Sequence, residues 1–276
     1  MGSEEDAAQA PWRPFLVAVG ALAMAGLLGL AVTSYVALRT SPGLRLDHAA
    51  ADAVSSPPLV LDRLYDGLSL VSVGSVAVSL TLCAMLAVVR HRFDLALGAV
   101  VVIGGADLTT QILKNDLFTR LGPGHGPNSL PSGHTTVALS IALAAVIVAP
   151  SAWRFTVAIV VSATAALVGV ALVLGRWHRP SDVIAAAFVC VVWAALGMLA
   201  AALVRPRPPV PASSVPVHVG ALIGASMAGG LLVSWGVRPQ PGLRDLALGI
   251  ISLGSIGLVC AVSVAAVAYI ADRHLG

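Results

Sequence analysis

The chain has 276 residues, of which 58% are hydrophobic and 11% are charged. Soluble domains carry about 25% charged residues, so this composition excludes an ordinary soluble protein and indicates one embedded in a membrane. The net charge is +3, but the basic residues are scattered and form no Lys/Arg-rich run with interleaved aromatic residues. We therefore expect no nucleic-acid partner.

The N-terminal tail, residues 1–14, is acidic and carries one basic residue, Arg13, before the first apolar run. A cleavable signal peptide has a basic start and a shorter apolar core. We therefore expect the first apolar run to be retained as a membrane anchor.

Long apolar stretches follow, each near the ~20 residues that cross ~30 Å of hydrocarbon. Because a helix satisfies its own backbone in lipid, they predict an all-α fold, a polytopic membrane helical bundle. The predicted spans are 15–37, 67–89, 93–113, 134–150 (a short one), 153–175, 182–204, 217–236 and 246–271.

The loop between the first two spans, 39–66, is polar but contains short apolar runs. It forms either a short helix in the membrane interface or an ordinary solvated loop. Further along, the Pro-rich linker 205–216 ends the six-span core 15–204, because proline cannot continue a helix. The extension 217–276 holds two more spans, and its Gly220 and Gly224 have the spacing of close helix packing.

The orientation of the spans can be inferred from the arginines in short loops. Short loops with arginines, at 90–92, 154 and 205–207, fall on one face, which is therefore predicted to be cytoplasmic. Two crossings separate the polar loops 114–134 and 175–182, so both are expected on the extracytoplasmic face, most simply of the plasma membrane.

The cysteines lie far apart in apolar spans and are predicted to be core residues rather than disulfides or metal ligands: Cys83, Cys190 and Cys260.

The loop KNDLFTRLGPGHGPNSLPSGH, residues 114–134, places ionisable groups at a membrane edge, where they indicate a site. Ser132 is a good N-cap for the next helix. The amides of Ser132, Gly133 and His134 are then predicted to point into the polar pocket and to bind an anion, most naturally phosphate. Plain N-capping is the alternative.

A second polar cluster, GRWHRPSD, places His178 four residues before Asp182 at the start of the sixth span. The carboxylate can accept a hydrogen bond from one imidazole nitrogen, which leaves the other unprotonated and nucleophilic. A purely structural pair is the alternative.

Fixed positive charge for a phosphoryl group is available from Lys114 and Arg120, although both side chains could instead snorkel at a helix end. Asp107 and Gln111 share a helical stripe with Lys114. We expect Asp107 to hold Lys114 in place, and a proton path is the alternative.

These three motifs together resemble the type 2 phosphatidic acid phosphatase superfamily of membrane lipid phosphatases, which shares its core with vanadium haloperoxidases. The resemblance covers about residues 60–204 and omits the last two spans. It implies that His178 is the nucleophile, that Asp182 orients it and that His134 protonates the leaving group. It further implies a phosphate-binding set without metal or cofactor, made of Lys114, Arg120, Ser132, Gly133 and an arginine of the third motif.

The sequence departs from the family pattern in two places. The first motif is one residue short, and Arg120 is followed by Leu121 rather than proline. The arginine of the third motif is replaced by Leu172. We expect Arg176, one turn further along the same helical face, to substitute for it, with Arg179 as a second candidate.

The expected function is hydrolysis of a lipid phosphomonoester or diphosphate, either phosphatidic acid-like or a polyprenyl (di)phosphate, through a phosphohistidine. The expected partners are this lipid phosphate and the surrounding membrane lipids. A non-catalytic lipid-phosphate binding or transport protein is the alternative.

Overall fold

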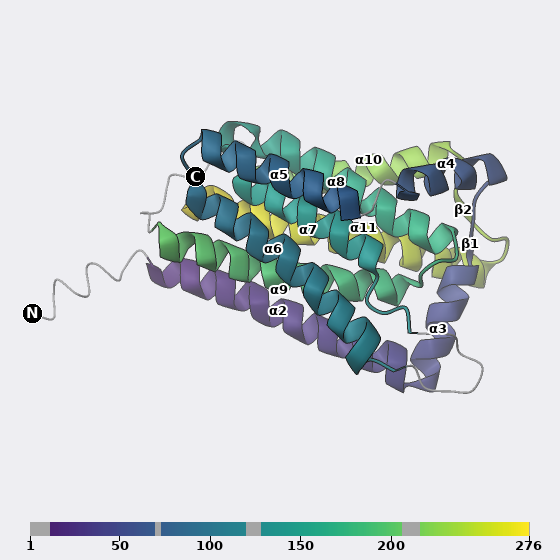
Figure 1. The fold of residues 1–276 in the computed structure, drawn as a ribbon. Helices are drawn as coiled ribbons and strands as arrows, with labels where there is room; N and C mark the ends of the chain where they lie inside the picture. The colour runs from purple at the N-terminus through teal and green to yellow at the C-terminus, as the bar shows by residue number, and fades with distance from the viewer. Residues whose placement is uncertain (1–11, 70–72, 120–127, 206–215, 276) are drawn as a thin grey trace, which may run out of the picture.

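Apolar helices dominate the computed structural model, which describes residues 12–69, 73–119, 128–205 and 216–275 (Figure 1). Within those ranges, six helices are long and apolar enough to cross a membrane, and two shorter apolar helices accompany them. The prediction of an all-α polytopic bundle is confirmed. The eight helices are α2 (Trp12–Arg39), α5 (Val73–Val89), α6 (Phe93–Ile112), α7 (Gly133–Val148), α8 (Ser151–Leu174), α9 (Pro180–Val204), α10 (Val217–Ser234) and α11 (Leu243–His274).

Most predicted spans agree with these helices to within a few residues, but the second span is wrong at its start. Residues 67–69 end a separate helix, α4 (Pro58–Ser69), and α5 begins at Val73. The Ser69 hydroxyl donates to the carbonyl of Asp66 at 2.6 Å in the last turn of α4. Most of the predicted tail 1–14 and of the linker 205–216 lies outside the described residues.

Helix α9 is central, because it contacts α2, α6, α7 and α11. Alanine and glycine allow this close approach, since small side chains let helix backbones come together. A Cβ added to Gly197 of α9 would lie 2.7 Å from the carbonyl oxygen of Gly98 on α6. Six alanines of α9 are fully buried: Ala185, Ala186, Ala187, Ala194, Ala195 and Ala201. The position of the α9 N-terminus is therefore fixed from several sides.

The loop between the first two spans is helical rather than irregular. It contains α3 (Ser41–Asp52) and α4, which lie at one end of the bundle (Figure 1). Thr40 caps α3, because its hydroxyl oxygen accepts from the amide of Gly43 at 3.1 Å. Between the two helices, β1 (Val54–Ser55) pairs antiparallel with β2 (Arg238–Pro239) from the α10–α11 connection. The extension is thus tied to the core by a short sheet.

The extension packs on the core through α10 and α8. A Cβ at Gly220 would lie 2.8 Å from the carbonyl oxygen of Phe155, and one at Gly224 would collide with the backbone of Ile159. The predicted packing role of these two glycines is confirmed. The three cysteines are buried and free, as predicted.

The end of the bundle remote from α3 is held by buried ion pairs. Arg154, in the first turn of α8, donates to Asp272 near the end of α11 at 3.0 Å. Arg92 pairs with Asp94 at 2.8 Å and also donates to the carbonyl of Leu275 at 3.1 Å. These contacts join α11 to the core at a second place.

Candidate active site

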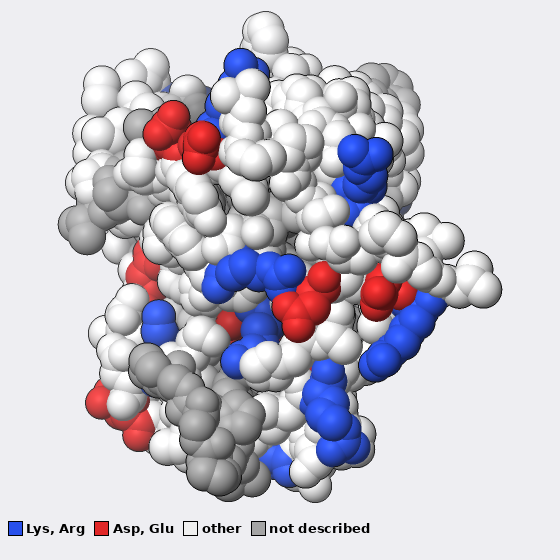
Figure 2. Space-filling model, turned by 90° about the vertical axis from the view of Figure 1, so that its right-hand side faces the viewer, with Lys and Arg blue, Asp and Glu red and all other residues white. Residues whose placement is uncertain are grey.

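The two polar motifs meet at the end of the bundle where α7 and α9 begin. The amide of Ser132, just before α7, donates to the carbonyl oxygen of Asp182 in the first turn of α9 at 3.0 Å. The prediction that both motifs share one face is confirmed. Figure 2 looks onto this end of the molecule, where Lys, Arg, Asp and Glu side chains stand among uncharged ones.

Ser132 is fully buried and caps α7, as predicted. Its hydroxyl oxygen accepts from the amide of Thr135 at 3.3 Å and from the Thr135 hydroxyl at 3.1 Å. The prediction that its amide points into the pocket is wrong, because that N–H is bonded to Asp182 in the close packing of the two helix starts. The amides of Gly133 and His134 have no acceptor within the helix, by the geometry of a first turn. Of the three amides predicted to bind an anion, those of Gly133 and His134 thus remain as candidates.

Asp182 is completely buried, and three polar groups lie within hydrogen-bond distance of one of its carboxylate oxygens. Its Oδ2 accepts from the Ser129 hydroxyl at 2.7 Å and from the Arg179 amide at 3.0 Å, and it lies 3.2 Å from Nδ1 of His178. A carboxylate oxygen in this position can accept a hydrogen bond from an Nδ1 that carries the proton, and in that tautomer Nε2 has the free lone pair. The arrangement therefore provides an oriented, nucleophilic imidazole nitrogen.

Ser129 was missed by the sequence reasoning. It stands three residues before the predicted cap, in a loop that the neighbouring Asn128 holds in place. The Asn128 side chain donates to the carbonyl of Leu130 at 2.7 Å and to that of Lys114 at 3.4 Å. A serine and an asparagine directly before a PSGH motif are a weak signal, since both are common loop residues.

The second histidine lies beside the first. The ring centroids of His134 and His178 are 6.5 Å apart. Reacting groups must come within a few ångströms of each other, and two rings this close can both contact the same phosphoryl group. The Trp177 ring lies 5.7 Å from that of His134 and stacks on Tyr65 at 5.3 Å. Sequence reasoning missed this aromatic pair, which fixes one side of His134.

A pocket of about 330 Å³ opens at His178. It is enclosed by the end of α3, by the loop before α7 and by the turn between α8 and α9. Its lining residues are His48, Ala51, Asp52, Ser129 and residues 176–179. Both arginines that the sequence offered as substitutes, Arg176 and Arg179, therefore face the same space as His178.

The expectation that Arg176 lies on the same helical face as Leu172 is wrong, although Arg176 does line the pocket at His178. Helix α8 ends at Leu174, and Arg176 lies beyond it with φ 59°, so no helical face connects it to Leu172. The left-handed turn brings Arg176 to the pocket, where it forms an exposed ion pair with Asp52. Leu172 is fully buried and packs with Leu68.

The first motif lies at the end of α6. Lys114 belongs to a π-helical turn, η1 (Leu113–Leu117). Its positive charge is close enough to His134 for an electrostatic interaction with that imidazole. Arg120 lies outside the described residues. The described residues contain no ion pair between Lys114 and Asp107, so the expected anchoring by Asp107 is wrong. Lys114 belongs to this π-turn, whereas Asp107 belongs to the regular helix α6.

The comparisons with known proteins agree with the motifs. The model of the PAP2 superfamily matches residues 15–206. A search of curated proteins gave no match, and a search of solved structures gave none either. The chain therefore belongs to the PAP2 superfamily, which generally comprises phosphatases, and at this coarse level it is an integral membrane phosphoric ester hydrolase.

Proposed function

We propose that the protein hydrolyses a lipid phosphomonoester or diphosphate through a phosphohistidine formed on His178. The observation that carries the proposal is the pair of imidazoles 6.5 Å apart, of which one is held by a buried carboxylate. The pair lies at the end of a membrane-spanning bundle. A lipid can present its phosphate there while its apolar chain remains among the helices.

In the first step, Nε2 of His178 attacks the phosphorus, and the bond from phosphorus to the ester or diphosphate oxygen breaks. His134 gives its proton to the departing oxygen. Asp182 keeps the proton on Nδ1 and stabilises the positive charge that the imidazole gains. In the second step, His134 takes a proton from water, the water oxygen attacks the phosphorus, and the N–P bond breaks to release phosphate.

Charge on the transferred group is stabilised by fixed donors around it. We assign this role to Lys114, Arg120 and Arg176 and to the amides of Gly133 and His134. Ser132 contributes through its cap, which orients that helix N-terminus. Positioning and electrostatic stabilisation are the main protein contributions to phosphoryl transfer, and a helix N-terminus suits a phosphate anion.

The test combines two histidine variants with three substrates that differ in their leaving groups. Purified protein is given phosphatidic acid, polyprenyl diphosphate and p-nitrophenyl phosphate, and phosphate release is measured with and without a chelator. We expect His178→Ala to lose at least about 10⁴-fold in kcat, as removal of a nucleophile does in other hydrolases. His218→Gln, which changes a histidine on α10, is the matched control and should retain activity.

His134→Gln separates the two proposed steps. The nitrophenolate leaving group needs no proton, so this variant should still be phosphorylated by p-nitrophenyl phosphate but release phosphate slowly. Acid-labile, base-stable phosphate should accumulate on His178. Phosphate release by His178→Ala from any of these substrates at the wild-type rate would contradict the proposal, as would binding of the lipid phosphates without any release.

A further inference from the structure

A second feature at the same end of the bundle is a groove that the phosphatase chemistry does not use. It has a volume of about 340 Å³ and lies between α2 and α11, with the first turns of α9 as its floor and α3 as its roof. Its side walls include Val32 and Val36 on α2 and Ile251 on α11. Helix α11 belongs to the extension, so this groove is not built by the matched core alone.

The mouth of the groove faces hydrocarbon. Three of its lining side chains are large, apolar and well exposed, namely Val32 at 61%, Leu46 at 58% and Ile251 at 64%. Exposed aliphatic side chains on membrane-spanning helices contact lipid chains. An alkyl chain from the leaflet on the site's side can therefore enter laterally between α2 and α11.

The interior of the groove holds a hydroxyl without a partner. Ser252 is 2% exposed and lines the groove, and its Oγ has no hydrogen bond within the described part of the chain. A buried donor left unsatisfied in apolar surroundings is costly, and such groups normally have a partner. A ligand that brings a polar acceptor into the groove would satisfy it.

Two arginines lie close in sequence to residues that line the groove. Arg39 and Arg244 are exposed and lie one helical turn beyond the lining residues Val36 and Leu248, on the same helix faces. Guanidinium groups at a membrane edge bind anionic headgroups.

We propose that this groove binds one chain of an anionic phospholipid, with its ester carbonyl accepting from Ser252 and its phosphate held by Arg39 and Arg244. The proposal does not depend on the phosphatase activity. The bound lipid would lie against Ser181, whose amide and hydroxyl donate to Asp47 on the roof at 3.0 and 2.6 Å. The lipid would thus contact the residue next to Asp182.

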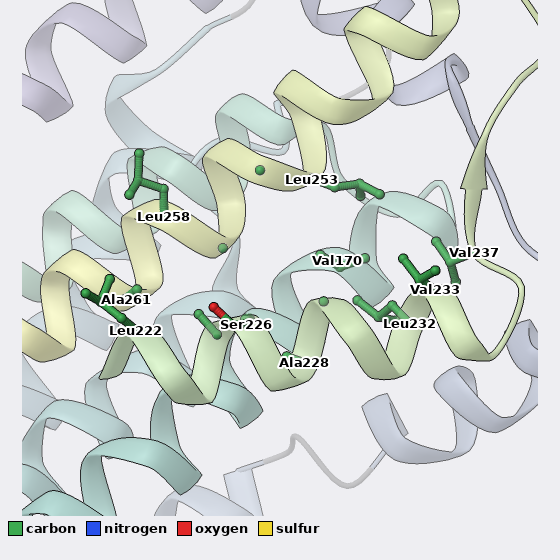
Figure 3. Close-up of a pocket in the computed structure, with 15 residues that line it drawn as sticks. Val170, Leu222, Ser226, Ala228, Leu232, Val233, Val237, Leu253, Leu258 and Ala261 are labelled. Carbon is green, nitrogen blue, oxygen red and sulfur yellow. The ribbon is translucent and has the colours of Figure 1, made fainter. Parts of the chain in front are cut away.

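A larger groove in the extension is the natural comparison. It has a volume of about 410 Å³ and lies between α8, α10 and α11 (Figure 3). It is open because Gly229, Gly254 and Gly257 have nothing within 4 Å of an added Cβ. Its serine, Ser226, is exposed rather than buried. It therefore lacks the unpartnered polar group that points to a ligand.

The test uses the full chain in vesicles that contain phosphatidylglycerol with a photoreactive group on one acyl chain. We expect cross-links in residues 32–37 and 248–255. Ser252→Ala should lower this labelling about fivefold, the ratio for one neutral hydrogen bond, without lowering the thermal stability of the protein in detergent. Unchanged labelling in Ser252→Ala would overturn the assignment of its hydroxyl.

Two further variants test the mouth without disturbing the core. Val32→Trp blocks the groove and should reduce these cross-links to background. The matched control is Val17→Trp, which changes a 70% exposed residue of the same helix that does not line the groove. Replacement of both arginines by glutamine should remove the preference for phosphatidylglycerol over an equally labelled phosphatidylcholine. Equal labelling in Val32→Trp and Val17→Trp would refute the groove as the site.

Discussion

The two ends of the bundle contain the same residue types but use them differently. At the end remote from α3, Arg154 is 1% exposed and donates to Asp272, to the carbonyl of Val146 and to that of Ala149. At the site end, the Arg176 side chain is 48% exposed and pairs with an Asp52 that is itself open to solvent. The first end uses its charges to join helices, and the second keeps them available to a ligand. Charge accessibility, rather than the presence of charge, distinguishes the candidate site.

Among variants that test this difference between the two ends, we expect the largest effect from the removal of a buried arginine at the remote end. Arg154→Ala should lower the free energy of unfolding by about 3–5 kcal/mol, because Asp272 stays buried without its guanidinium partner. Thermal unfolding in detergent measures the loss. The double variant Arg154→Met with Asp272→Leu should recover much of it. Phosphate release per folded molecule should stay the same, and a selective loss of activity at full stability would contradict a purely structural role.

An intermediate effect is expected at Ser129, which connects the loop before α7 to Asp182. Ser129→Ala removes one of the donors to the carboxylate, and we expect kcat to fall about tenfold, since a hydrogen bond to a charged group contributes about 1.5 kcal/mol or more. The pH dependence of kcat should shift as well, because His178 depends on the same carboxylate. Ser129→Thr keeps the hydroxyl and should restore most of the rate. A variant with wild-type kinetics and pH profile would exclude this role.

The smallest effect is expected at the exposed pair of Arg176 and Asp52. Exposed ion pairs contribute about 1 kcal/mol or less, so neither Arg176→Gln nor Asp52→Asn should change thermal stability measurably. Arg176→Gln should raise KM for a lipid phosphate about fivefold if the guanidinium binds phosphate. Asp52→Asn should leave KM unchanged or lower it, because it releases the arginine. Equal KM changes in both variants would indicate that the ion pair itself matters.

The sequence was sufficient for the spans and for the neighbourhood of the two motifs. Apolar length determines which stretches cross the membrane, and two crossings return a chain to the same side. Ser132 could be identified as a cap because a hydroxyl directly before an apolar helix has few other uses. These features depend on local chemistry, on the length of apolar stretches or on the number of membrane crossings.

Features that depend on contacts between distant residues could not be predicted. Arg154 and Asp272 are separated by 118 positions, and nothing in either segment marks them as partners. The arginine loops served as an orientation signal in the sequence, whereas in the structure Arg92 and Arg154 also form buried ion pairs. The π-turn at Lys114 and the left-handed Arg176 were missed for another reason. Both break the helical period on which the sequence argument relied.

The hydrogen bond from the Ser132 amide to the Asp182 carbonyl has a practical consequence for enzymology. Both of its atoms belong to the main chain, so no replacement of a side chain deletes it directly. Inactive variants at His134 or His178 should therefore keep the two helix starts in register. Such proteins would be suitable for equilibrium titration with intact lipid phosphates, free of turnover during the measurement.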